Sequence, residues 1–395
     1  MKNLSEKIYD KFKQLFSKEP TLIRSPGRAN LIGDHTDYNN GFVLPAAINK
    51  HIILAIAPND LQLVRAYAMD MDKPYFKADL TGEIVPGPHG WTNYLLGVIF
   101  MLKKSNVNLS GFDCVFGGNI PIGAGLSSSA ALENAFIFGL DSLLDLGLSK
   151  IEIAELGQQV ENQFVGVNCG IMDQFANLHG KKNHLIRLDC RTLEHHLISF
   201  NDEQIRIVLF DTNVHRELAD SEYNKRRQQC EEGTAFFARK NPAVQSLRDV
   251  TFEMLERGKK KLDPTVYNRC RFVLDENRRV EHACDHLQEG DLESFGTCMY
   301  ESHYGLRDLF EVSCRELDLL VEKAESLDGV IGARMMGGGF GGCTINLVWK
   351  DRLEEISETL STYYRTETKI KPNVYVAKTA DGTDTLSLKD TIQYE

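Results

Sequence analysis

The carboxylates of Asp34 and Asp37 and the imidazole of His35 lie within four consecutive positions, between segments that are apolar enough to be buried. Such a group has three interpretations. It can be a polar turn, a metal site, or a site for a neutral sugar or polyol, whose hydroxyls carboxylates bind in pairs. The metal site has the least support, because the fixed ligand spacing of metal motifs is missing.

A glycine-rich stretch at residues 120–133 is typical of a loop that opens a helix. Its glycines allow the backbone to approach a ligand closely, and the free N–H groups of a first helical turn suit phosphate oxygens. An ordinary turn with a serine cap is the alternative. A cap needs one hydroxyl, so three in a row favour a phosphate site. The residues concerned are Gly123, Ala124, Gly125, Leu126, Ser127, Ser128 and Ser129.

Two further carboxylates stand in apolar surroundings. Asp173 lies among glycine, isoleucine, methionine and phenylalanine in residues 169–175, where an acid needs a partner or a task. Its alternative role is to cap a helix over residues 174–178. Glu161 borders the apolar stripe of a helix that starts at a capping box. A carboxylate at that edge is either partly solvated or able to reach a cation.

Two aromatic residues and a second glycine-rich loop complete the candidates. Trp91 and Tyr94 are three residues apart at the start of a predicted helix, where core packing is the default and an aromatic wall beside a flat ring is the alternative. Residues 337–342 fit the dinucleotide pattern Gly-x-Gly-x-x-Gly, but they lead into a strand, whereas that pattern must open a helix. We expect this loop to pass close to another backbone instead.

The elements that must position these residues follow from the apolar spacing. Residues 51–57 and 61–68 alternate like two paired strands, and the basic pair Arg226-Arg227 is expected to be solvated. Other predicted helices are 7–16, 91–102, from 222 onward, 267–287, 292–309, 315–326 and 353–363, and other predicted strands are 114–118, 184–188, 205–211, 343–349 and 373–377.

Length and composition limit the class of protein. A chain of 395 residues predicts two domains, with a boundary near residues 200–204. A net charge of −11 argues against nucleic acid and anionic membranes as partners, because both need a basic face. The first residues lack the apolar run of a signal peptide, and no stretch has the length of a membrane span, so we expect a cytoplasmic protein. Nine scattered cysteines without a Cys-x-x-Cys pair are expected to be reduced thiols.

Several segments together resemble a known kinase family. Residues 25–39, with the sequence SPGRANLIGDHTDYN, resemble the galactokinase signature. Residues 120–133 resemble the phosphate loop of the wider family of galactokinase, homoserine kinase, mevalonate kinase and phosphomevalonate kinase (GHMP). Similar matches at residues 169–175, 221–227 and 334–343 follow in the family's order, so the resemblance covers nearly the whole chain.

The resemblance implies an α+β fold of two lobes. Residues 1–200 are expected to form a ribosomal-S5-like mixed-sheet lobe and residues 201–374 a ferredoxin-like lobe, with residues 375–395 returning to the first. The implied reaction is ATP-dependent phosphorylation of the anomeric hydroxyl of α-D-galactose, with Mg²⁺ as cofactor. We expect a monomer whose ligands are galactose and ATP.

The resemblance also implies a role for each site residue. Asp173 is the expected catalytic acid/base, which either deprotonates or positions the hydroxyl, and Arg28 is the neighbouring cation. Mg²⁺ is expected on Ser129 and Glu161, and adenine beside Trp91 and Tyr94. The residues expected to bind sugar are Asp34, His35, Asp37, Gly170, Asp173 and Tyr223, and those expected to hold the ATP phosphates are 123–129.

The sequence departs from the family pattern at Asp34, where glutamate is usual. The shorter side chain affects sugar choice more than the reaction. Met336 replaces the usual threonine and Gly338 the common alanine. Both changes affect the packing of the loop, and we expect both to be tolerated. A kinase for a related sugar, such as N-acetylgalactosamine or galacturonate, is one alternative, and a galactose sensor without turnover is another. The sensors have lesions in the serine-alanine part of the phosphate loop, which is whole here, so an enzyme is favoured.

Overall fold

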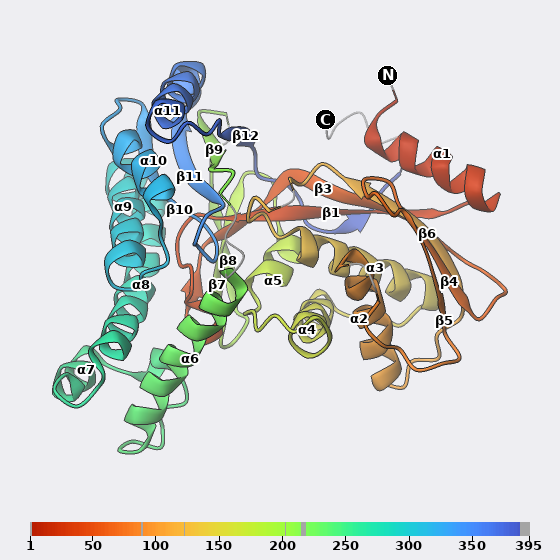
Figure 1. Ribbon diagram of the computed structural model, residues 1–395, viewed down its shortest axis with the longest axis horizontal. Coiled ribbons are helices and arrows are strands. Elements are labelled where there is room, and N and C mark those ends of the chain that lie inside the picture. The colour runs from red at the N-terminus through yellow and green to blue at the C-terminus, as the bar shows by residue number, and fades with distance from the viewer. Residues whose placement is uncertain (1, 88–89, 122, 202, 215–218, 388–395) are drawn as a thin grey trace.

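The protein has two lobes that pack side by side, as the computed structural model in Figure 1 shows. It describes residues 2–87, 90–121, 123–201, 203–214 and 219–387. Within these residues, the first lobe contains a six-stranded sheet in the order β13-β1-β3-β6-β4-β5. Strand β4 runs parallel to β6 and the other neighbours are antiparallel. The strands are β1 Thr21–Asn30, β3 Pro45–Pro58, β4 Leu63–Ala68, β5 Tyr75–Asp79, β6 Phe112–Gly118 and β13 Asp384–Thr385.

Successive side chains of a strand point to opposite faces of the sheet, and here both faces carry apolar side chains. Helices therefore cover both faces. On one face, Ile53, Ala55 and Val115 pack against Ile8 and Phe12 of helix α1. On the other face, the intervening side chains of the same strands form the main core with four helices. Figure 1 shows α1 above the sheet and the four helices below it. The helices are α1 Leu4–Phe16, α2 Gly90–Lys104, α3 Ser128–Leu144, α4 Lys150–Val160 and α5 Met172–His179.

The second lobe has its own sheet, whose strands in the described range 205–377 are ordered β10-β11-β9-β12 and are antiparallel. Helices α10 and α11 pack on one face around Leu320 and Leu360. On the other face, Ile207 and Leu209 share a hydrophobic cluster with Leu31 of the first lobe, so the two lobes have a common core. The elements are β9 Ile205–Asp211, β10 Val330–Met335, β11 Cys343–Trp349, β12 Asn373–Ala377, α10 Arg315–Glu325 and α11 Leu353–Thr368.

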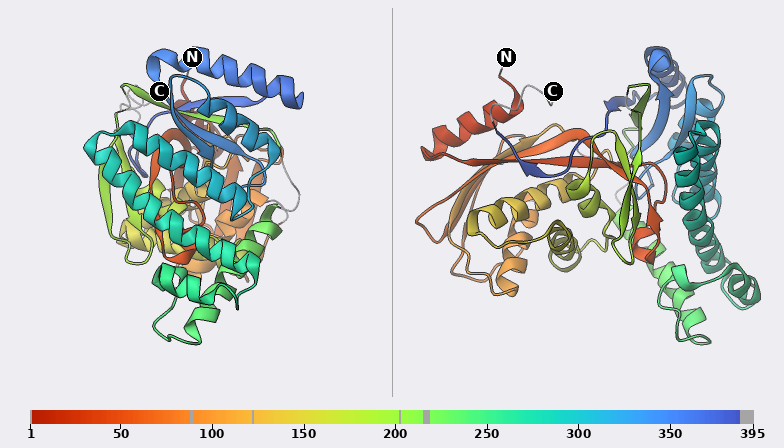
Figure 2. Two further views of the ribbon diagram at one scale, coloured as in Figure 1. Left: turned by 90° about the vertical axis from the view of Figure 1, so that its left-hand side faces the viewer. Right: turned by 180° about the vertical axis from the view of Figure 1, so that it is seen from behind.

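The long helix α8 lies along the side of the second lobe, where Figure 2 shows it beside α9. It begins at Pro264 after the N-cap Asp263, whose carboxylate accepts two backbone N–H groups, and it ends at Glu289, which is followed by the C-cap Gly290 with φ 77°. The remaining elements are α6 Ala219–Ala238, α7 Phe252–Gly258, α8 Pro264–Glu289, α9 Leu292–Asp308, a small sheet of β2 Phe42–Val43, β7 His184–Asp189 and β8 His195–Ser199, and the short helices η1 Asp37–Asn39, η2 Glu161–Val165, η3 Leu247–Asp249 and η4 Lys350–Arg352.

Two predictions from the sequence are wrong. Residues 51–57 and 61–68 are strands, but β6 lies between β3 and β4 in the sheet, so they are not partners. Local alternation cannot reveal a later strand that inserts between two earlier ones. Arg226 is buried rather than solvated, because its Nε donates to the carbonyl of Phe310 at 2.8 Å and its Nη2 to that of Glu311 at 2.7 Å. A helix that packs on another element can bury a guanidinium whose donors meet carbonyls.

The predicted boundary near residue 200 falls between β8 and β9, and the division of the chain there stays a prediction. The chain re-enters the first sheet at its end, where Thr385 of β13 is paired with Ile23 of β1. Ile122 of the predicted phosphate loop and residues 388–395 lie outside the described residues. Within the described part of the chain, no helix combines the length and the apolar character that crossing a membrane requires.

Candidate active site

A cavity of about 440 Å³ lies between the lobes and gathers residues from both. Strand β1, the loop after it and helices α3 and α5 contribute from the first lobe. Helix α6 and the glycine-rich loop after β10 contribute from the second, the latter through Gly337, Gly338 and Gly339. The predicted site residues that line the cavity are Arg28, Asp34, His35, Asp37, Ser129, Glu161, Asp173 and Tyr223.

Arg28 and Asp173 form a two-point ion pair in this cavity. The Nε and Nη2 atoms of Arg28 donate to the two carboxylate oxygens at 2.8 Å each. Arg28 also donates through Nη1 to the carbonyl of Gly125, so it joins β1 to the glycine-rich loop. Asp173 lies in the first turn of α5, and its carboxylate also accepts the Ser127 hydroxyl. The cap interpretation of Asp173 is therefore wrong, because the carboxylate serves side chains across the cavity.

Asp34 is held by donors from both lobes. Its Oδ1 accepts from Asn30 at 2.7 Å, and its Oδ2 accepts from the Gly337 N–H at 2.8 Å and from Arg334. Burial acts to raise the pKa of Asp34, but the Arg334 cation and the Asn30 hydrogen bond outweigh it and hold the pKa below its ordinary value. A carboxylate has about four accepting positions. Three donors therefore leave one accepting position of Asp34 for a further donor.

His35 is a neutral imidazole among aromatic rings. Burial lowers the pKa of His35 to about 4, although the Asp34 charge opposes the shift. The Tyr38 hydroxyl lies 2.8 Å from its Nδ1, and the ring centres of Tyr223 and Phe310 lie 5.4 and 4.8 Å from its own. Because Nδ1 is engaged with Tyr38, the neutral ring has only Nε2 left for a hydrogen bond to a hydroxyl.

Asp37 packs directly against Gly170. A Cβ atom at position 170 would lie 2.1 Å from Oδ2 of Asp37, so glycine is required there to leave room for the carboxylate. Burial and, next, the nearby charge of Asp173 raise the pKa of Asp37 to about 7. Gly170 thus provides the space that the Asp37 side chain occupies.

The glycine-rich loop leads into α3, as predicted, with Gly123 and Gly125 at φ 79° and 70°. Ser127 stands at the N-cap with φ 55°, and its hydroxyl goes to Asp173. The serine cap that the sequence offered as an alternative is thus not formed within the described residues. The positive end of this 17-residue helix favours an anion at the loop.

Ser129 and Glu161 meet on the wall of the cavity. The nearby Ser129 hydroxyl acts to lower the pKa of the buried Glu161 carboxylate, but burial is the larger effect and raises that pKa to about 7. Among the described residues, no cluster of three or more His, Cys, Asp or Glu side chains could hold a metal. A cation here would take these two oxygens and complete its shell with phosphate and water, which is the habit of Mg²⁺. The pair fits that ion.

A second, mainly apolar cavity of about 320 Å³ adjoins the first, and Ser129 lines both. Trp91 packs edge-on against Phe116 and Phe76 with ring centres 5.3 and 5.9 Å apart, which confirms core packing for most of its ring. Trp91 and Tyr94 also line the cavity, so the aromatic wall is present as well. Other lining residues are Ile52, Phe116, Ile120 and Leu132.

The second glycine-rich loop passes close to other backbones, as predicted. A Cβ atom on Gly339 or Gly341 would lie 2.2 Å from the carbonyl oxygen of Val312 or Val214. The loop leads into β11 rather than a helix, which agrees with the rejection of the dinucleotide pattern.

Sequence reasoning missed the residues that hold Asp34 and its loop, namely Asn30, Glu276 and Arg334. Arg334 is 300 positions from Asp34, and Glu276 is 243 positions from Gly33. The available signal was a charged residue at an apolar-facing position of a predicted helix or strand, as at Glu276 of α8. Such a residue needs a partner.

Comparison with known proteins gives three family matches. The galactokinase galactose-binding signature matches residues 10–58, the GHMP kinase N-terminal domain residues 93–181, and the GHMP kinase C-terminal domain residues 283–366. The structure of Lactococcus lactis galactokinase complexed with galactose is similar with a TM-score of 0.91 and 36% sequence identity. The match covers 96% of this chain and 98% of that one.

More distant relatives share the fold alone. Mevalonate kinase from Methanococcus jannaschii has a TM-score of 0.64 and 18% identity over 92% of this chain and 99% of that one. Phosphomevalonate kinase from Streptococcus pneumoniae, in complex with phosphomevalonate and AMPPNP, has a TM-score of 0.61 and 15% identity over the same shares. These likenesses confirm the predicted two-lobed fold.

Proposed function

The chain belongs to the galactokinase family of GHMP kinases, and we propose on this basis that it transfers the γ-phosphoryl group of ATP to the C1 hydroxyl of α-D-galactose. The products are galactose 1-phosphate and ADP. One observation carries the proposal: the Arg28–Asp173 ion pair lies in a cavity that both the signature residues and the start of α3 line. An acid, a cation, a polyol site and an anion site thus meet at one place.

The sugar is proposed to bind in the larger cavity. Asp34 and Asp37 accept its hydroxyls, the neutral His35 gives a further hydrogen bond, and Tyr223 lines the same wall. The position of the Asp34 carboxylate is fixed, because Asn30 and Arg334 donate hydrogen bonds to it. Gly170 contributes by leaving space for Asp37.

ATP is proposed to enter from the adjoining apolar cavity. Its adenine ring lies beside Trp91 and Tyr94, which line that cavity. Its phosphates lie on residues 123–129, where the positive end of α3 favours their charge. Ser129 lines both cavities, so the γ-phosphate is placed at their junction, facing the sugar.

In the proposed reaction, the sugar O1 bonds to the γ-phosphorus while the bond from that phosphorus to the bridging β–γ oxygen breaks and ADP leaves. Asp173 accepts the hydrogen bond or the proton of the attacking hydroxyl. Arg28 lies next to it and stabilises negative charge on the transferred group. The transition state of such a transfer is loose, so correct placement of the hydroxyl contributes much of the catalysis.

Ser129 and Glu161 are the residues proposed to hold Mg²⁺. When bound there, the ion would neutralise phosphate charge and orient the nucleotide. Both residues line the larger cavity, so their oxygens face the same space. The monomeric state and the cytoplasmic location expected above remain part of this proposal.

A coupled ADP-release assay tests the function. The sugars are galactose, N-acetylgalactosamine, galacturonate, glucose and arabinose, each with Mg²⁺-ATP, and Asp173→Asn serves as the blank. Turnover on galactose supports the proposal. Turnover on another sugar alone would indicate that Asp34, in place of the usual glutamate, has changed the sugar specificity. Binding of galactose in calorimetry without turnover would indicate a sensor rather than an enzyme.

A further inference from the structure

Both ends of the sugar-binding loop, residues 33–42, are attached to helix α8 of the second lobe. At one end, the Gly33 N–H donates to Oε1 of Glu276 at 3.0 Å. At the other end, the Phe42 N–H donates to Oδ1 of Asn277 at 2.9 Å. Between these ends lie His35 and Asp37. Neighbouring residues of one helix thus fix both ends of the loop that carries the proposed sugar contacts.

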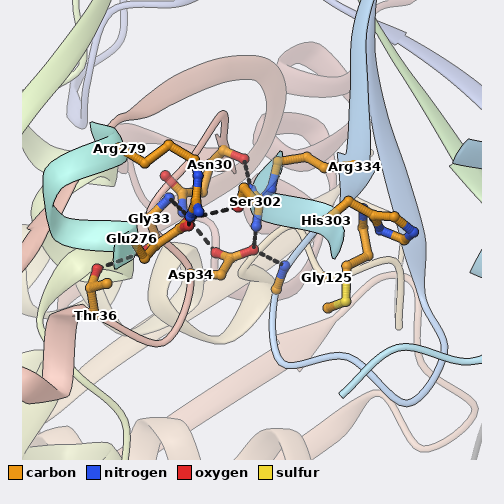
Figure 3. A network of polar contacts seen from close by, with 12 residues as sticks. Asn30, Gly33, Asp34, Thr36, Gly125, Glu276, Arg279, Ser302, His303 and Arg334 are labelled. Atoms are coloured by element: carbon orange, nitrogen blue, oxygen red, sulfur yellow. Dashed lines mark hydrogen bonds and ion pairs between the residues drawn. The ribbon is translucent and has the colours of Figure 1, made fainter. Parts of the chain in front are cut away.

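Glu276 is built into this place by further partners. It is 0% exposed, and its Oε1 also accepts the Ser302 hydroxyl of α9 at 2.6 Å, while its Oε2 pairs with Arg279. Figure 3 shows Glu276 between Gly33 and Ser302. A buried carboxylate is costly unless its oxygens are used. A charged acceptor also binds a backbone N–H more strongly than a neutral one does.

The Gly33 backbone has little freedom to shift. Its φ is +97°, and a Cβ atom there would lie 2.7 Å from the carbonyl of Phe42 and 2.9 Å from Cγ2 of Val280 on α8. The next residue, Asp34, is held from β10 by the buried Arg334 (Figure 3). The loop therefore lies between two buried charges of the second lobe, a carboxylate on its Gly33 amide and a guanidinium on Asp34.

We propose that Glu276 is a positioning residue for the sugar site, which sets Asp34 and His35 in place through the Gly33 amide. The proposal rests on the proposed function, because it assumes that the loop binds the sugar. Glu276 is outside the cavity lining and acts through the backbone. Loss of its acceptor should thus weaken sugar binding and leave the nucleotide site intact.

The test compares Glu276→Ala and Glu276→Gln with Glu301→Gln, by steady-state kinetics on galactose and on ATP. Glu301 is the control, since it contacts Arg279 at 3.5 Å from the exposed side. Because a hydrogen bond to a charged group contributes more than one to a neutral group, loss of the Glu276 acceptor in Glu276→Ala should raise the galactose KM about tenfold or more. Its ATP KM should stay within about twofold of the wild type. Glu276→Gln keeps an oxygen for the Gly33 N–H and should raise the galactose KM less.

Ser302→Ala covers the case in which Glu276→Ala does not fold. It removes one donor to Oε1 and leaves the carboxylate less fixed, so the galactose KM should rise about two- to fivefold. An unchanged galactose KM in the folded variants, or equal rises for galactose and ATP, would overturn the proposal. If the wild type itself does not turn over galactose, the proposed function fails first, before any variant is compared.

Discussion

Glu161 should link the Mg²⁺ requirement to pH. A metal binds the carboxylate form alone, and burial raises the pKa of Glu161 to about 7 in the metal-free protein. With that pKa, about nine-tenths of the Glu161 side chains are charged at pH 8 and about one-tenth at pH 6. The apparent dissociation constant for Mg²⁺ should therefore rise about tenfold between pH 8 and pH 6.

The assay is ADP release at saturating galactose and fixed ATP, with Mg²⁺ varied at each pH. ATP also takes up protons in this range, so the matched control is Glu161→Gln, whose side chain does not titrate. The variant should need more Mg²⁺ at pH 8 and should retain only the pH dependence of the nucleotide. If the Mg²⁺ requirement of both proteins changes by the same factor between pH 8 and pH 6, the reasoning about Glu161 is refuted.

Three other perturbations test neighbouring groups. Asp173→Asn should lower kcat about 10²- to 10⁴-fold in a protein that still melts cooperatively by circular dichroism, and normal turnover would remove its role. Burial and Asp173 raise the pKa of Asp37 to about 7, so the galactose KM should rise as pH falls from 8 to 6; a flat profile would contradict a carboxylate acceptor. Burial and then Glu161 raise the pKa of Glu133 well above its ordinary value, so its contribution to stability is full at low pH and is lost as pH rises through the raised value. Glu133→Gln should therefore raise the melting temperature relative to wild type more at pH 8 than at pH 5, and an equal shift at both would count against this.

Local features of the fold could be predicted because local physics decides them. The apolar stripe and the capping box gave α4, and both hydrogen bonds of that box are present between Ser149 and Glu152. The predicted pairing of β3 with β4 was wrong, because alternation of apolar and polar residues identifies a strand but not the strand beside it. Sheet order depends on where residues 112–118 return, which is a long-range matter.

The same limit applies to the site. Arg28 and Asp173 could be predicted together because they stand in segments that resemble a family, and Glu161 was predicted as a role that the same resemblance implies. The contacts of Glu276 and Arg334 could not be predicted, since their partners are far away along the chain, although Arg334 begins the resembling segment 334–343. The burial of Arg226 was missed for a related reason. Its hydrogen-bond acceptors are backbone carbonyls of a segment more than 80 residues away, which the local sequence does not show.

The return of the chain to the first sheet has a consequence for the order of folding. Thr383 is completely buried, and its hydroxyl donates to Asn177 of α5 at 2.6 Å and contacts Ser25 of β1 at 3.0 Å. Helix α5 also carries Asp173. On the ribosome, the first lobe therefore lacks an edge strand, and a buried hydrogen bond on the helix that carries Asp173, until residue 385 has left the exit tunnel. Although lobes often fold in the order of synthesis, the first lobe should be completed only after the whole second lobe, residues 205–377, has been synthesised.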